Sequence, residues 1–130
     1  YYNGLLEISR SDDWTGWCCF FLKAMTAQAQ ENHQKATRTL NLYEAEKNRF
    51  VELTHSQHAI KALDFIFTRP VFQASDFTSQ SGIPKSTAIR ILATLRSEGL
   101  FSILSEKQGR KPAVLAFREL LNIAEGREVF

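Results

Sequence analysis

Proline and glycine are scarce in this chain, and their absence marks its longest feature. Of the 130 residues, three are proline and six are glycine, and none of either lies between residues 17 and 53. The spacing predicts a helical segment of about 37 residues there, about 55 Å long at 1.5 Å per residue. Ser11, Asp12 and Asp13 offer N-caps ahead of Trp14. We expect the first half of this helix to pack into a folded domain and the second half to form a strut. The apolar pattern weakens near residues 32–39, so a break in the helix would lie there.

Cysteine is limited to the adjacent pair Cys18 and Cys19. Adjacent cysteines rarely bridge each other, and between Trp17 and Phe20 we expect buried thiols in a reducing compartment rather than a redox or metal site. No apolar run approaches the ~20 residues that span a membrane, and no charged-then-apolar leader is present. We therefore expect a cytoplasmic protein with no membrane partner. The chain begins at Tyr1 without Met, so we expect it to be a fragment of something longer.

Net charge is also small, at +2, so the overall balance does not by itself demand nucleic acid. The distribution is more informative. Residues 1–55 carry a net charge of −1 and residues 56–130 a net charge of +3, and residues 84–112 hold six basic side chains against two acidic ones. This excess predicts a modest basic patch in the second half of the chain. A hydrophobic content of 44% suits an ordinary core for one domain or two small ones.

The most regular pattern lies within residues 75–100. A short amphipathic segment ends at Gly82, Pro84 precedes a longer segment, and Gly99 closes it. Proline near the first position of a helix and glycine just past its last position are the usual signals of helix ends. Two helices joined by a tight turn that contains glycine form a helix-turn-helix. The apolar stripe predicted for the second helix comprises Pro84, Ala88, Ile91, Leu92 and Leu95.

Two short apolar runs follow, at residues 100–105 and 113–117, and the Gly109 segment between them predicts a hairpin. Helix, turn, helix and basic hairpin is the layout of a winged helix, and residues 82–117 resemble the winged helices of many bacterial regulators. The residues expected to contact DNA or a partner are Lys85, Ser86, Thr87, Arg90, Lys107, Arg110 and Lys111. Ile89 shares the outer helix face but fits poorly, because base-reading positions are usually polar.

The remaining elements of residues 54–130 follow from local signals. Thr54 and Gln57 have the spacing of a capping box, which would open a helix. That helix must end before Pro70, since the residue before a proline is pushed out of helical geometry. Its apolar face would comprise Ile60, Leu63, Ile66 and Phe67. Val71 and Phe72 predict a short edge strand, and residues 117–124 predict a final short helix.

The first 53 residues carry a second pattern, rich in aromatic residues. Its members are Tyr1, Tyr2, Leu5, Asp13, Trp14, Trp17, Phe20, Phe21, Leu22, Ala24, Gln28 and Ala29. This pattern is similar to the end of the Fic (filamentation induced by cAMP) domain, and a winged helix after it is a frequent Fic architecture. The expected fold is mainly α: the end of an all-helical Fic-like domain with a long exit helix over residues 1–53, then a winged helix of three helices and a small β-hairpin over residues 54–130. We expect the upstream part of a longer protein to cover the aromatic face, with the winged helix or another subunit as alternatives.

The resemblance implies a parent protein that transfers AMP from ATP, with Mg, to a protein hydroxyl through His-Pro-Phe and Gly-Asn-Gly-Arg motifs. Neither motif occurs here, and His33, His55 and His58 lie in polar surroundings, so we assign this chain no catalytic residue, cofactor or metal. We expect a non-catalytic region whose winged helix binds double-stranded DNA or docks a target protein or another subunit, including a second copy. The alternative is a DNA-binding transcription regulator with an N-terminal dimerisation helix.

Overall fold

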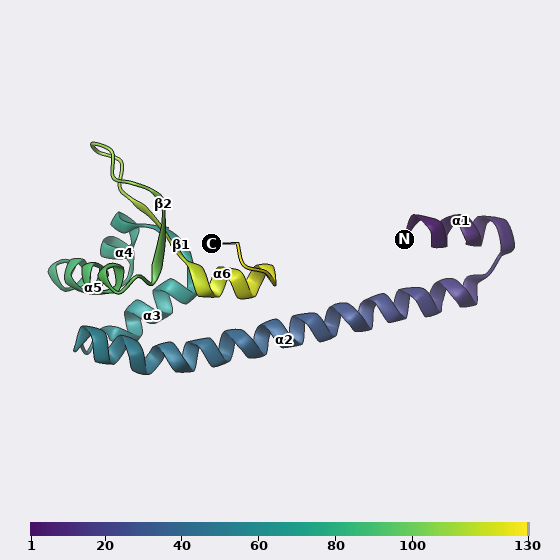
Figure 1. The fold of residues 1–130 in the computed structure, drawn as a ribbon, viewed down its shortest axis with the longest axis horizontal. Coiled ribbons are helices and arrows are strands. Elements are labelled where there is room, and N and C mark those ends of the chain that lie inside the picture. Colours follow the sequence, from purple (N-terminus) through teal and green to yellow (C-terminus); the bar gives the residue numbers. More distant parts are fainter. Residues whose placement is uncertain (130) are drawn as a thin grey trace. The chain divides into compact units, whose positions relative to one another are not determined.

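The computed structural model describes residues 1–129, and it is mainly helical with one small antiparallel sheet (Figure 1). The helices are α1 (Tyr2–Ser11), α2 (Trp14–Thr54), α3 (Ala59–Thr68), α4 (Ala74–Gln80), α5 (Lys85–Ser97) and α6 (Arg118–Glu125). The strands are β1 (Val71–Gln73), β2 (Phe101–Ser105) and β3 (Val114–Phe117). The chain divides into two compact units, Tyr1–Thr37 and Arg38–Phe130. Within residues 1–129, no helix is long and apolar enough to cross a membrane.

In the first unit, a tight turn at Asp12 joins α1 to α2. Asp12 adopts the left-handed conformation, with a φ of 55°, and its carboxylate accepts a hydrogen bond of 2.8 Å from the indole N–H of Trp14. Asp13 accepts a bond of 2.8 Å from the backbone N–H of Gly16, which leaves one fewer unpaired donor in the first turn of α2. Of the predicted N-caps, Asp13 is therefore confirmed, whereas Ser11 is the last residue of α1 and Asp12 is its C-cap.

The aromatic side chains of this unit are largely exposed. Tyr2 is 80% exposed and Trp14 is 60% exposed, and no residue of α1 is buried. Cys18 and Cys19 are both exposed, so the prediction of buried thiols is wrong. The reason is that α1 covers little of α2, mainly the Trp17 side chain. The expected packing of the first half of the long helix is likewise not found among the described residues.

The long helix is continuous from Trp14 to Thr54, so no break occurs at residues 32–39. Pairs of side chains one turn apart support this segment without tertiary burial. Lys35 forms an ion pair of 3.0 Å with Glu31, and the hydroxyl of Thr37 donates a bond of 3.0 Å to the carbonyl of His33. Ion pairs at this spacing each contribute a few tenths of a kcal/mol, about 0.2–0.5, to an isolated helix.

The last turns of α2 belong to the core of the second unit. Phe50 is fully buried, and Leu42, Tyr43 and Leu53 pack against the same core. The phenol of Tyr43 donates a hydrogen bond of 2.7 Å to the carboxylate of Asp64 on α3. The two units therefore divide inside α2, because the apolar residues near the end of this helix need the second unit to cover them.

The predicted capping box at Thr54 and Gln57 is wrong. Thr54 is the last residue of α2, and its hydroxyl donates a hydrogen bond of 2.7 Å to the carbonyl of Phe50. The α3 helix begins only at Ala59, after His58. Since Thr54 lies within a helix, its hydroxyl bonds to the preceding turn instead of capping a following one.

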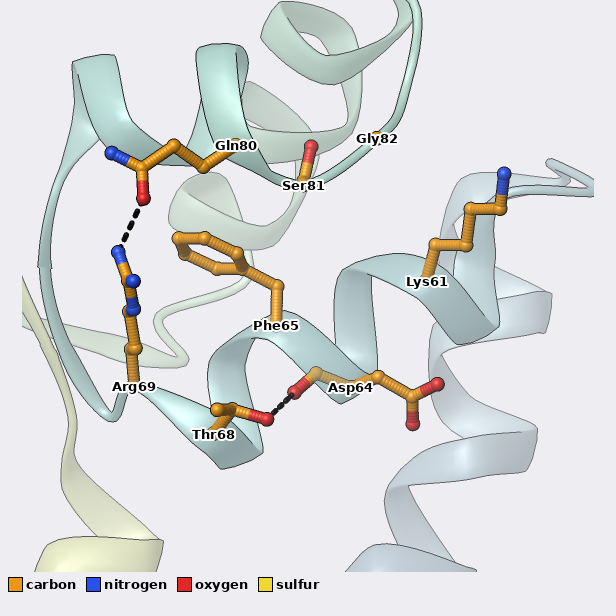
Figure 2. Close-up of a pocket in the computed structure, with 8 residues that line it drawn as sticks. All are labelled: Lys61, Asp64, Phe65, Thr68, Arg69, Gln80, Ser81 and Gly82. Atoms are coloured by element: carbon orange, nitrogen blue, oxygen red, sulfur yellow. Dashed lines mark hydrogen bonds between the residues drawn. The ribbon is translucent and has the colours of Figure 1, made fainter.

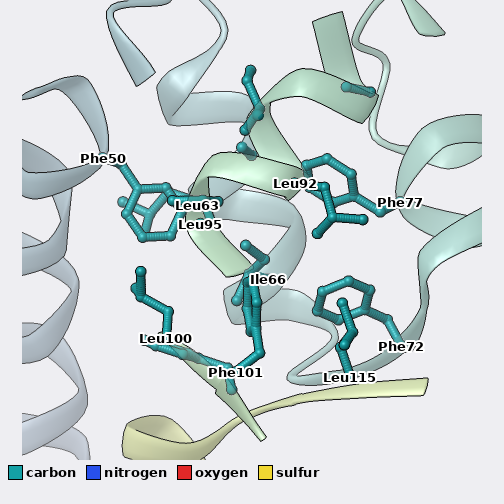
Figure 3. Packing of buried hydrophobic residues seen from close by; sticks show 14 of the residues in the cluster. Phe50, Leu63, Ile66, Phe72, Phe77, Leu92, Leu95, Leu100, Phe101 and Leu115 are labelled. Carbon is teal, nitrogen blue, oxygen red and sulfur yellow. The ribbon is translucent and has the colours of Figure 1, made fainter. Parts of the chain in front are cut away.

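The predicted strand at residues 71–72 is confirmed, and α3 ends before Pro70 as expected. The sheet has the order β1-β3-β2, so β1 and β2 are its edges. Phe72 pairs with Leu115, and Phe101 pairs with Phe117. One face of this sheet packs on the helices through a continuous cluster (Figure 3): Phe50, Leu63, Ile66, Phe72, Phe77, Leu92, Leu95, Leu100, Phe101 and Leu115.

The end of α5 shows how glycine sets the direction of the chain. Gly99 has a φ of 74°; its N–H donates to the carbonyl of Arg96, and the N–H of Leu100 donates to the carbonyl of Leu95. This is the Schellman arrangement, in which the two bonds satisfy the last carbonyls of the helix. The buried side chains of Leu95 and Leu100 accompany it, so the turn leads directly into β2.

A substitution at Gly99 should therefore weaken the second unit. Gly99→Ala should lower the free energy of unfolding by about 1–2 kcal/mol, because a Cβ disfavours the left-handed conformation although the space around it is open. Gly99→Asn should lower it by less, since asparagine tolerates this conformation. Urea unfolding followed by circular dichroism measures both. Equal stability of Gly99→Ala and wild type would contradict the strain argument.

Candidate nucleic-acid interface

The α5 helix presents its first turn to solvent. Lys85 and Ser86 are exposed, and Thr87 is half-buried. Gly82, with a φ of 72°, and the buried Ile83 lead the chain from α4 into this turn. The opposite side of α5 is buried through Ala88, Ile91, Leu92 and Leu95, as predicted, whereas Pro84 is exposed. The predicted outer face of this helix therefore lies outside the core.

Arg90 has an intramolecular partner that its sequence position does not reveal. Its guanidinium donates a hydrogen bond of 3.2 Å to the backbone carbonyl of Thr54, the last residue of α2. The final carbonyls of a helix lack partners within the helix and carry partial negative charge, so a cation is stabilised there. Arg90 thus joins α5 to the end of α2 through one of its N–H donors, and the residue remains exposed at the surface.

The three cations of the hairpin are gathered on one narrow turn. Gln108 and Lys111 exchange two backbone hydrogen bonds, of 3.2 and 2.9 Å, around Gly109 and Arg110. Gly109 has a φ of 58°, as the first central residue of a type II′ turn requires. Lys107, Arg110 and Lys111 are all exposed, and the tip extends away from the helices (Figure 1).

Among residues 1–129, no acidic side chain forms an ion pair with these cations. The ion pairs of that part of the chain are Lys35 with Glu31, Lys47 with Glu44, and Arg49 with Glu46, and all six residues lie on α2. The candidate residues therefore form two exposed groups, one at the start of α5 and one at the hairpin tip, while Arg90 is bonded elsewhere. Exposed and unpaired cations on two adjacent elements can bind an extended polyanion.

A shallow groove of about 230 Å³ lies between α4 and α5. Its lining residues are Ala74, Thr78, Ile89, Leu92, Ala93 and Arg96. Ile89 is 52% exposed, a large fraction for an isoleucine next to a core helix face. Sequence reasoning placed Ile89 on this face and counted Arg96 among the basic residues, but it missed Ala74 and Thr78, since only the packing of α4 on α5 brings them here.

A second hollow, of about 440 Å³, lies between α3 and the end of α4 (Figure 2). Its lining residues are Lys61, Asp64, Phe65, Thr68, Arg69, Gln80, Ser81 and Gly82. Arg69 donates a hydrogen bond to the side-chain oxygen of Gln80 and lies 5.9 Å from the ring centre of Phe65. These contacts hold α3 against the end of α4. They therefore help to position the turn that precedes α5.

Asp64, which lines this hollow, also joins α3 to α2 through Tyr43. Hydrogen bonding to Asp64, aided by partial burial, raises the pKa of the Tyr43 phenol, because the neutral phenol is the donor. His55 follows the last residue of α2 with a φ of 47°, and His58 precedes α3. Over residues 1–129, no cluster of three or more histidine, cysteine or acidic side chains has metal-binding geometry.

Comparison with protein-family models gave no match for this chain, and comparison with curated protein sequences gave none either.

Proposed function

We propose that residues 54–130 form a winged helix-turn-helix domain that binds double-stranded DNA, in the non-catalytic C-terminal region of a Fic-type protein. The observation that carries the DNA assignment is the position of the cations on this fold. The elements follow the order α3, β1, α4, α5, β2, β3, and unpaired cations lie on the first turn of α5 and on the tip of the β2–β3 hairpin. In a DNA-binding helix-turn-helix, the second helix enters the major groove.

The chemistry of both groups suits phosphate. The N-terminus of α5 offers unpaired backbone N–H groups and a favourable dipole, and Lys85 adds a full positive charge beside it. The hydroxyls of Ser86 and Thr87 can donate to phosphate oxygens. Arg110 and Lys111, on a projecting turn, can reach the backbone on the far side of the groove.

The Fic assignment concerns the first 53 residues and is supported by their aromatic pattern. In this proposal the AMP-transfer motifs, with their ATP and Mg, lie outside these 130 residues, because the chain contains no His-Pro pair. The region supplies no catalytic residue, and we place the protein in the cytoplasm. The winged helix would then link a transferase to DNA.

A transcription regulator with an N-terminal dimerisation helix is the second candidate. The observation that favours it is the exposure of large apolar side chains on α1 and α2: Tyr2, Trp14, Leu22 and Met25. Contiguous exposed apolar surface usually marks an interface. The two candidates differ in what covers this face, which is the rest of a Fic domain in one and a second copy of the chain in the other.

Fluorescence anisotropy with mixed-sequence duplex DNA tests the DNA assignment. If about four phosphates are contacted, the salt slope is about −3.6, so the affinity should fall roughly 100-fold between about 50 and 200 mM salt. The variant Arg110→Glu/Lys111→Glu should bind at least about 10-fold more weakly at the lower salt and show a slope shallower by about 2.

The control variant is Lys23→Glu/Arg38→Glu, which makes the same change in net charge on α2. It should retain most of the affinity and the full salt slope. Absence of binding at low salt, or equal losses in the two variants, would contradict a phosphate contact at the hairpin. Docking of a protein target would then be the better assignment, because it predicts a weak salt dependence.

A further inference from the structure

The part of the exposed α5 face that lies next to α4 carries few groups that can read a base edge by hydrogen bonds. Arg90 is bonded to the carbonyl of Thr54. The side chains that remain on the α4 side are Ile89 and Ala93, with Lys85 and Arg96 around them. Their spacings of three, four and seven residues along the helix place them on one surface.

The apolar part of this surface is built by two helices. Ile89 and Ala93 share a groove with Thr78 and Ala74 of α4, so methyl groups from both helices line it. Arg96 lines the same groove, Lys85 lies one turn before Ile89 on α5, and α5 contains no acidic residue, so the charge beside the groove on this helix is positive. An apolar groove with a cationic rim complements a polyanion that displays methyl groups, and a duplex rich in thymine is such a ligand. Thymine presents its C5-methyl group in the major groove, where apolar side chains contact it.

We propose that Ile89, with Ala93 and Thr78, contacts the C5-methyl groups of thymines and gives this domain a preference for A·T-rich sites. The inference rests on the proposed DNA binding and adds its sequence preference. Ile89 is then a specificity-determining residue, whereas Lys85 and the hairpin cations supply affinity that is independent of sequence. The exposure of Ile89 on the outer helix face is consistent with this assignment.

Two duplexes of equal length test it, one of alternating adenine and thymine and one with uracil in place of every thymine. They have the same phosphates and the same hydrogen-bonding edges, and they differ in the C5-methyl group. Wild-type protein should bind the thymine duplex about fourfold more tightly for each methyl group that it buries. Ile89→Ala should bring the two affinities close together, and Ile89→Val should keep most of the difference.

The matched control is Ile103→Ala on β2, which removes the same atoms from a residue with 47% exposure. It should keep the preference for thymine, and circular dichroism should show all variants folded. Equal binding of the two duplexes by wild type, or an unchanged preference in Ile89→Ala, would overturn the inference and leave DNA binding intact. Failure of wild type to bind either duplex at low salt would instead overturn the proposed function.

Discussion

Replacing Phe50 with alanine is expected to lower the free energy of unfolding of the second unit by about 3–5 kcal/mol. Phe50 is fully buried, and it is the α2 residue whose ring points toward Leu63 and Leu95 in Figure 3. Its removal takes a large apolar side chain from the core and leaves a cavity, since α3 and α5 are each held by other contacts and cannot close fully around it. Because it anchors the last turns of α2, the loss should also weaken the bond from Arg90 to Thr54.

The measurement needs a probe in the correct unit. Both tryptophans, Trp14 and Trp17, lie in the first unit, so their fluorescence does not report on this core. Urea unfolding by circular dichroism, combined with hydrogen exchange of the α3 and α5 amides, reports on it directly. Phe20→Ala is the control, because this ring is 43% exposed on the same helix and its loss should cost less than about 1 kcal/mol. A stability change at Phe50 as small as that of the control would show that α2 does not belong to this core.

Replacing Glu46 is expected to stabilise the same region. The residue is only 4% exposed; one of its carboxylate oxygens accepts a bond of 3.3 Å from Arg49, and the other is buried without a hydrogen-bond partner. A buried and unpaired polar atom costs about 1–3 kcal/mol. Glu46→Leu should therefore raise the free energy of unfolding by about 1–3 kcal/mol near neutral pH, and Arg49, which is partly exposed, can turn to water.

The effect of Glu46 on the free energy of unfolding should depend on pH. Burial raises the pKa of Glu46 above its ordinary value of 4.5, and Glu119 adds to this, while Arg49 opposes it. The folded protein therefore binds the proton more tightly than the unfolded chain. The resulting stabilisation is fully present below about pH 4.5 and is lost as the pH rises through the higher folded pKa.

Glu46→Gln should consequently match wild type in acid and exceed it in stability as the pH approaches neutrality. Thermal unfolding across this pH range measures the difference. Glu44→Gln is the control, because Glu44 is exposed on the same helix and its ion pair with Lys47 spans 3.9 Å. An increment at Glu46 that does not grow with pH would show that the carboxylate finds a partner or water in solution.

The candidate interface was partly predictable from sequence. Exposure of Lys85 and Ser86 on the first turn of α5 followed from the buried stripe on the opposite side of that helix. The hairpin cations followed from the glycine turn between two apolar runs. The bond of Arg90 could not be predicted, because its partner carbonyl lies 36 residues away and any backbone carbonyl is a chemically equivalent acceptor.

Two of the wrong predictions share a cause. The break in the long helix was inferred from a weak apolar periodicity, and the burial of Cys18 and Cys19 from their aromatic neighbours. Periodicity shows which side chains would suit a core, but it does not show whether another element covers them. In the first unit α1 covers little of that face, and in the middle of α2 local ion pairs and hydrogen bonds maintain the helix without a core.

The sequence by itself determined the features that depend on a few neighbouring residues. These include the ends of α5 at Pro84 and Gly99, the end of α3 before Pro70, and the turn at Gly109, because each depends on backbone sterics within a few residues. Only the tertiary structure decided that Phe50 and Glu46 are buried and that Arg90 is bonded to Thr54. Burial and long-range hydrogen bonds depend on which surfaces pack together. The free energy of the whole packed unit decides this packing, and the sequence of a single segment does not.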